Sequence, residues 1–119
     1  MQLIYTTDLL SGYVSDRETF WMSTGLFPQE MIIKLSKPGI VEDISIKGVK
    51  LKEVIFLGSS NNNSTWEEFG HLELNDSDGI QMGTINAREY RDKMAFLKIK
   101  ILGGWNDFCA IRSVNVAPA

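Results

Sequence analysis

The alternation of apolar and polar side chains is the feature that most constrains the fold of this chain. From Ala95 to Ile101, apolar residues alternate with Lys98 and Lys100. A period of two is typical of a strand that buries one face. We expect strands at residues 2–6, 31–35, 40–46, 49–57, 66–74, 80–85, 95–101 and 108–116.

Two of these segments also predict which residues share a face. In the segment 49–57 the apolar residues lie on one face, opposite Lys50 and Lys52: Val49, Leu51, Ile55 and Leu57. In the segment 40–46 three isoleucines face the core and polar residues face out: Ile40, Ile44 and Ile46 against Asp43, Ser45 and Lys47. Both predictions assume that the alternation runs unbroken along each strand.

Segments rich in Gly, Pro, Asn and Asp separate the expected strands, at residues 37–39, 58–63, 75–79 and 103–104. These residue types favour turns. The segment 86–93 is the one candidate for a helix, and it is too short for a core helix. Seven to nine short strands joined by turns predict an all-β antiparallel sandwich. Because no linker or repeat interrupts the chain, we expect a single domain over residues 1–119.

The segment 18–30 packs three aromatic residues around Gly25 and Pro28. Burial of a side chain such as Trp21 or Phe27 stabilises a fold by roughly 2–3 kcal/mol. Gly25 and Pro28 are suited to fix the backbone turns between the rings. We therefore expect this loop to fold into the core just before the strand at 31–35.

The composition excludes several classes of protein. The formal net charge is -3 and the pI is about 5.1, whereas phosphate binding needs a positive field, so nucleic acid is not an expected partner. The single Cys109 cannot form an internal disulfide and suits a reducing compartment. We see neither a signal peptide nor the ~20 apolar residues that span a bilayer. A soluble, cytosolic type of protein without membrane insertion is expected.

Residues with catalytic potential are few. His71 is the only histidine, so an acid–base pair or zinc site based on histidine has little to build on, and we expect a solvated or hydrogen-bonded strand residue. Cys109 lies in an apolar strand and is expected to be buried and inert. Glu67 and Glu68 are adjacent in a strand and point to opposite faces. Since no phosphate loop or nucleophile elbow is present, we expect no enzymatic activity.

Two motifs resemble the intraflagellar transport protein 25 family, also called heat shock protein beta-11. The first lies in residues 18–30 and contains Thr19-Phe20-Trp21, Thr24-Gly25 and Phe27-Pro28-Gln29-Glu30. The second lies in residues 96–114 and contains a strand, the turn Gly103-Gly104-Trp105-Asn106-Asp107-Phe108 and a last strand that ends in Val114. The motifs stand in compatible order, so the resemblance spans most of the chain.

This resemblance implies a jelly-roll β-sandwich of the galactose-binding or discoidin type, with about eight to nine strands. It also implies a non-catalytic subunit of the intraflagellar transport B complex, located in the cilium or flagellum and the cytoplasm. Members of the family pair with a Rab-like small GTPase, intraflagellar transport protein 27. The same partner is therefore expected for this chain.

The resemblance further implies a calcium loop ahead of the Thr-Phe-Trp motif. Thr19 matches the threonine of the family, and Asp16 is the nearest carboxylate, although aligning it requires a gap. Calcium prefers six to eight oxygen ligands, and Arg17 brings an opposing charge. The alternative is that the Thr19 hydroxyl caps the loop. The residues at 75–79 are also rich in oxygen, but the downstream acid of a calcium loop is absent, which favours a hydrophilic turn.

A subunit that docks on a GTPase needs an exposed apolar or aromatic patch. Trp66, Phe69 and Tyr90 are candidates for it, and for each the alternative is a place in the core. Two other functions stay open. Trp105 could stack on a sugar or lipid head group as part of a binding module, or the chain could be a jelly-roll adaptor of another multiprotein machine.

Overall fold

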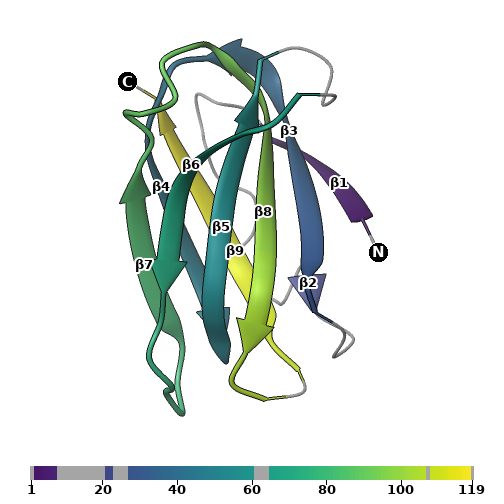
Figure 1. The fold of residues 1–119 in the computed structure, drawn as a ribbon, viewed down its shortest axis with the longest axis vertical. Helices are drawn as coiled ribbons and strands as arrows, with labels where there is room; N and C mark the ends of the chain where they lie inside the picture. The colour runs from purple at the N-terminus through teal and green to yellow at the C-terminus, as the bar shows by residue number, and fades with distance from the viewer. Residues whose placement is uncertain (1, 8–20, 23–26, 61–64, 107, 119) are drawn as a thin grey trace.

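The computed structural model describes residues 2–7, 21–22, 27–60, 65–106 and 108–118. Its regular elements are all strands, and they form two facing sheets (Figure 1). The five-stranded sheet has the order β1 (Gln2–Thr7), β3 (Gln29–Gly39), β8 (Met94–Gly104), β5 (Leu51–Ser59) and β6 (Glu67–Glu73). The four-stranded sheet has the order β2 (Trp21–Met22), β9 (Ala110–Pro118), β4 (Val41–Val49) and β7 (Gln81–Asn86). The predicted all-β sandwich is confirmed.

Every expected strand is present, and the main additions come from the aromatic segment. Strand β2 was not predicted, and it pairs Trp21 with Ile111 of β9. Phe27 is half-buried and packs against the core, as expected. Residues 18–20 and 23–26 lie outside the described part, so the rest of that prediction is not tested. Over the described residues, the chain contains no helix with the length and apolar character to cross a membrane.

The sandwich is antiparallel as predicted, apart from one pair of strands that is parallel. Strand β1 runs parallel to β3, with Gln2 opposite Glu30 and Thr7 opposite Leu35. All other paired strands are antiparallel. Parallel neighbours need a long crossover connection. The stretch between β1 and β3 is long enough to supply it and passes through β2 in the other sheet (Figure 1).

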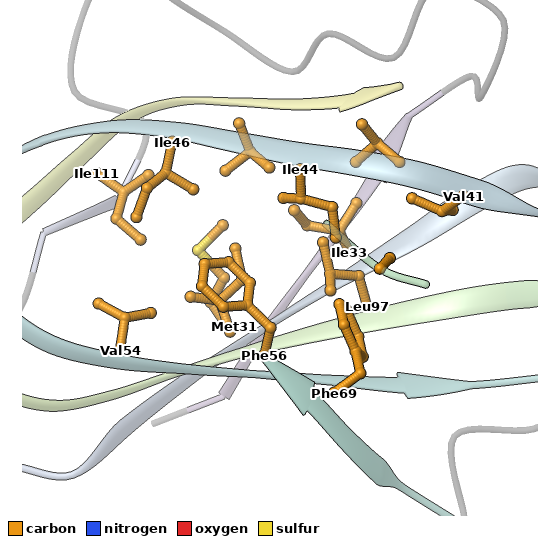
Figure 2. Close-up of a cluster of buried hydrophobic side chains, with 14 of the residues drawn as sticks. Met31, Ile33, Val41, Ile44, Ile46, Val54, Phe56, Phe69, Leu97 and Ile111 are labelled. Carbon is orange, nitrogen blue, oxygen red and sulfur yellow. The ribbon is translucent and has the colours of Figure 1, made fainter. Parts of the chain in front are cut away.

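The core lies between the sheets and is built from the inward faces of both (Figure 2). Among the side chains whose burial is described, Phe56 is the largest that is fully buried, and it points from the five-stranded sheet toward Ile44 and Ile46 of the other. Full burial of each such side chain contributes roughly 1.5–3 kcal/mol. The inward residues of β3 and β8 follow the predicted alternation: Met31, Ile33, Leu35, Leu97, Ile99 and Ile101.

The predicted faces of β5 are wrong beyond its first residue. Leu51 is buried, but Val54 and Phe56 face the core, while Ile55 and Leu57 lie half-buried on the outer face. The pairing of β5 with β8 shifts register between Leu51 and Val54. An extra residue at such a bulge moves all later side chains to the opposite face.

Two other local predictions are also wrong. Ile40 is 43% exposed, because it joins β3 to β4 at one end of the sandwich instead of lying within a strand. The segment 86–93 contains no helix; the Tyr90 amide donates a hydrogen bond to the Ala87 carbonyl at 3.1 Å, which makes a turn. Ile44 and Ile46 face the core as predicted.

The edge strands β6 and β7 lie on the same side of the sandwich, one in each sheet (Figure 1). A Cβ atom added to Gly70 would lie on the Ile85 side chain, and one added to Gly83 would lie 2.5 Å from Leu72 Cδ2. The glycines therefore let the two edges close over each other's apolar side chains. Within the described part of the chain, strand β7 pairs with β4 alone, and none of its six residues is ionisable.

We predict that Gly48→Ala destabilises the fold. A Cβ atom at this buried position in β4 would lie 2.6 Å from the Ala110 carbonyl oxygen of β9, a backbone atom that cannot move aside, and would also meet the Leu51 side chain. Overpacking of this kind costs about 1–3 kcal/mol, measurable as a lower urea midpoint. In the matched control Gly103→Ala nothing lies within 4 Å of the new Cβ. Equal stability of the two variants would contradict the prediction.

Candidate docking surface

Three turns meet at the lower end of the sandwich in Figure 1: the β4–β5 turn at Lys50, the β6–β7 loop at residues 74–80 and the β8–β9 turn, of which residues 105–106 and 108–109 are described. Each turn connects one sheet to the other. Hydrogen bonds join all three. The end of the molecule is therefore one connected surface.

Gln81, the first residue of β7, is the buried centre of these connections. Its side-chain oxygen accepts a hydrogen bond from the Leu51 amide at 2.7 Å. Its side-chain nitrogen donates to the carbonyl oxygens of Leu51 and Asn75, both at 2.8 Å. A buried amide is tolerated when its donors and acceptor are satisfied. Gln81 thus fixes the β6–β7 loop against the start of β5.

Trp105 fixes the β8–β9 turn to the other two. Its backbone amide donates to the Lys50 carbonyl at 2.8 Å, and its indole Nε1 donates to the Leu74 carbonyl at 2.9 Å. The Lys52 ammonium lies 4.8 Å from the ring centroid, within reach of a cation–π contact. The indole is nevertheless 39% exposed. Trp105 is both an anchor of the turns and part of the surface.

Lys50 completes the connections through the oxygen-rich turn. Among the non-glycine residues that the structure describes, Lys50 has a positive φ angle, 58°. This left-handed backbone conformation lets the chain turn from one sheet to the other. Lys50 Nζ donates to Asp76 Oδ1 at 2.8 Å and lies 4.0 Å from Asp78 Oδ1. This hydrogen bond raises the pKa of Lys50 and lowers the pKa of Asp76. Lys50 supplies the positive charge that the acidic turn needs.

Three large apolar side chains are exposed at this end, and we call them the turn surface: Ile80 (52%), Trp105 (39%) and Phe108 (61%). A rigid backbone that presents apolar groups with a polar rim is the usual anatomy of a docking site. Of the other exposed large hydrophobic residues in the described part, Ile40 lies at the opposite end of β4, and Met82 lies on the outer face of the four-stranded sheet.

The structure does not bring the three predicted docking residues together on the surface. Phe69 and Tyr90 are 6% and 5% exposed, and their ring centroids lie 5.9 Å apart in the core. Phe69 turns inward because the pairing of β5 with β6 shifts register around it. Burial raises the pKa of the Tyr90 phenol. Trp66 is half-buried, and the Lys98 ammonium lies 4.4 Å from its ring centroid.

The remaining candidates have clear places. His71 is exposed on β6 and hydrogen-bonds to Glu53 at 2.8 Å, as predicted for a strand residue. Cys109 is buried, as predicted. Asp16 and Thr19, the expected calcium ligands, lie outside the described residues. Sequence reasoning missed Gln81 and the turn role of Lys50; a polar residue at an inward strand position was the signal for Gln81.

The chain is similar in sequence to an intraflagellar transport protein. It is 29% identical over 100 residues to the intraflagellar transport protein 25 homolog of Mus musculus. The aligned region covers 82% of this chain and 68% of the mouse protein. No protein-family model matches the chain.

The described strands superpose on several solved sandwiches. A family 32 carbohydrate-binding module of Clostridium perfringens, in complex with GalNAc-β-1,3-galactose, has a TM-score of 0.66 at 15% identity and covers 82% of this chain and 73% of its own. An F5/8 type C domain of Bacteroides fragilis has a TM-score of 0.62 at 14% identity (81% and 70% covered). XRCC1, bound to the DNA polymerase β catalytic domain, has a TM-score of 0.69 at 11% identity (90% and 99% covered). The fold is a jelly-roll sandwich of the galactose-binding type.

We predict that Asp76→Asn lowers the melting temperature at neutral pH and has no effect in acid. The folded pKa of Asp76 lies below the ordinary value of 3.8, so its contribution to stability is complete above that value and is lost as the pH falls through the folded pKa. Thermal melts of both proteins across this range check the prediction. The control Asp78→Asn, at the longer distance from Lys50, should change the melting temperature less. A difference in melting temperature between the natural protein and Asp76→Asn that grew larger in acid would contradict this prediction.

Proposed function

We propose that this protein is a non-catalytic subunit of the intraflagellar transport B complex that binds a Rab-like small GTPase, intraflagellar transport protein 27. Its place of action would be the cilium or flagellum and the cytoplasm. The observation that carries the proposal is the similarity to the mouse intraflagellar transport protein 25 homolog over 82% of the chain. The two motifs that resemble this family, at residues 18–30 and 96–114, add support.

The geometry of the described residues supports a scaffold role. Three turns are fixed to one another by Gln81, Trp105 and Lys50, so the turn surface would lose little conformational entropy on binding. The shifted pKa values belong to an exposed ion pair and a core tyrosine. Neither arrangement suits acid–base catalysis, which typically pairs shifted groups in a cleft. We assign the turn surface as the docking face.

We predict that Phe108→Asp weakens the complex with the GTPase by at least about tenfold, which corresponds to about 1.4 kcal/mol. Phe108 is 61% exposed, so a charge there should leave the fold intact while opposing burial in an interface. The measurement is co-purification followed by a binding titration with purified components.

The matched control is Ile40→Asp, which places the same charge on an exposed isoleucine at the opposite end of the sandwich. This variant should bind like the natural protein. If the natural protein forms no complex at micromolar concentration, the proposed function is wrong. If both variants bind equally well, the GTPase docks on another face and the assignment of the turn surface is wrong.

A second candidate is a carbohydrate-binding module. Trp105 borders a hollow of about 300 Å³ whose other lining residues are Lys52, Glu53, Glu73, Leu74 and Asn75. An exposed aromatic ring beside polar groups is the usual arrangement for stacking on a sugar. The Lys52 ammonium over the ring competes for the same position, which is why we rank this function second.

We predict, for this second function, that galactose would quench the tryptophan fluorescence of the natural protein in a saturable way. Trp105→Phe keeps an aromatic ring but loses the hydrogen bond from Nε1 to Leu74 and removes the reporting indole, so this variant is measured by calorimetry and should bind galactose more weakly. An unchanged emission spectrum at millimolar galactose would remove this candidate for that sugar.

A further inference from the structure

Three ionisable side chains gather on the outer face of the five-stranded sheet. Strands β5 and β6 pair in a register that places Glu53 directly opposite Glu73. His71 precedes Glu73 by two residues on β6 and therefore points to the same face. All three side chains are accessible, with side-chain exposures of 39% for Glu53, 45% for His71 and 76% for Glu73.

The two glutamates would repel each other without a cation between them. Like charges at directly opposed positions of an antiparallel pair are destabilising. His71 Nε2 lies 2.8 Å from Glu53 Oε2 and 3.9 Å from Glu73 Oε1. One ligand atom from each residue lies within 4.8 Å of the other two. The sheet thus holds one imidazole nitrogen and two carboxylates around a single point.

We propose that Glu53, His71 and Glu73 form a binding site for a divalent transition-metal ion of the Zn²⁺ type. In a tetrahedral zinc site with bonds of about 2.0–2.2 Å, neighbouring ligand atoms stand about 3.3–3.6 Å apart. The separations of 2.8 and 3.9 Å lie on either side of that range, and all three ligand atoms lie within 4.8 Å of one another, so the site closes slightly around an ion. Small rotations of the glutamate side chains would bring the ligand atoms to the separations of a tetrahedral site. The bound ion would then replace the hydrogen bond between His71 and Glu53.

The chemistry of the three side chains selects the class of ion. An imidazole nitrogen together with carboxylate oxygens suits Zn²⁺ and its first-row neighbours. Calcium needs six to eight oxygens, and these residues offer fewer. Three protein ligands leave a fourth position open. Glu53 and Glu73 also line the hollow beside Trp105, so that position is open to water or to a ligand atom of a bound partner.

Lys52 does not neutralise these carboxylates. It lines the same hollow, but its ammonium lies over the Trp105 ring at 4.8 Å. Among the ion pairs of the described residues, the partner that approaches Glu53 or Glu73 is the imidazole of His71, and no lysine or arginine takes part. The site therefore carries a net negative charge while the imidazole is neutral, the form in which histidine binds metals.

The test is a titration of the untagged natural protein with Zn²⁺, followed by calorimetry and by NMR of the imidazole. Because His71 is the only histidine in the chain, its resonances report on this site alone. We expect one zinc ion per chain, micromolar affinity, and shifted imidazole resonances. His71→Ala should abolish this binding, and Glu73→Gln should weaken it by at least about tenfold, since even partners of metal ligands are worth 10–100-fold in affinity.

The control variant is Glu68→Gln, which removes an exposed carboxylate from the same strand but outside the cluster; it should bind zinc like the natural protein. Metal-free melts of every variant check the fold. The proposal is wrong if zinc at millimolar concentration gives no saturable binding, if the imidazole resonances stay in place, or if His71→Ala binds as tightly. The titration uses no partner protein, so its result is independent of the proposed function.

Discussion

The apolar interface between the two sheets is the constraint on which the rest of this structure depends. Phe56, Met31 and Ile99 on one sheet pack against Ile44, Ile46 and Val114 on the other. Since these inward residues are committed to the core, the register of the strands that carry them is fixed. The fixed register then decides which side chains meet on the outside, including Glu53, His71 and Glu73.

Much of this sandwich could be predicted from local alternation. Strands β3 and β8 follow a period of two, and their inward residues were assigned correctly from the sequence. Alternation cannot reveal a bulge, because the extra residue is accommodated by pairing with a distant strand. That is why Ile55 and Leu57 were assigned to the wrong face of β5, and why the sequence left open whether Phe69 lies on the surface or in the core.

The candidate sites were harder to predict because they depend on contacts between turns and on cross-strand register. Gln81 meets Leu51 at a separation of 30 residues, and His71 meets Glu53 at 18. A lone histidine gave no reason to expect a metal site until the register supplied two carboxylates in place of a second imidazole. The resemblance to the ciliary family came instead from motifs of adjacent residues, which a sequence displays directly.

Strand β7 has a consequence for how this protein behaves on its own. Among the described strands it pairs with β4 alone, on one side, and it carries no proline and no ionisable residue along Gln81–Asn86. The unpaired backbone groups of such a rim, an exposed edge strand, can hydrogen-bond to a strand of another chain. A long-lived companion that shields the rim would keep the polypeptide in solution at concentrations where the solitary chain is prone to aggregate.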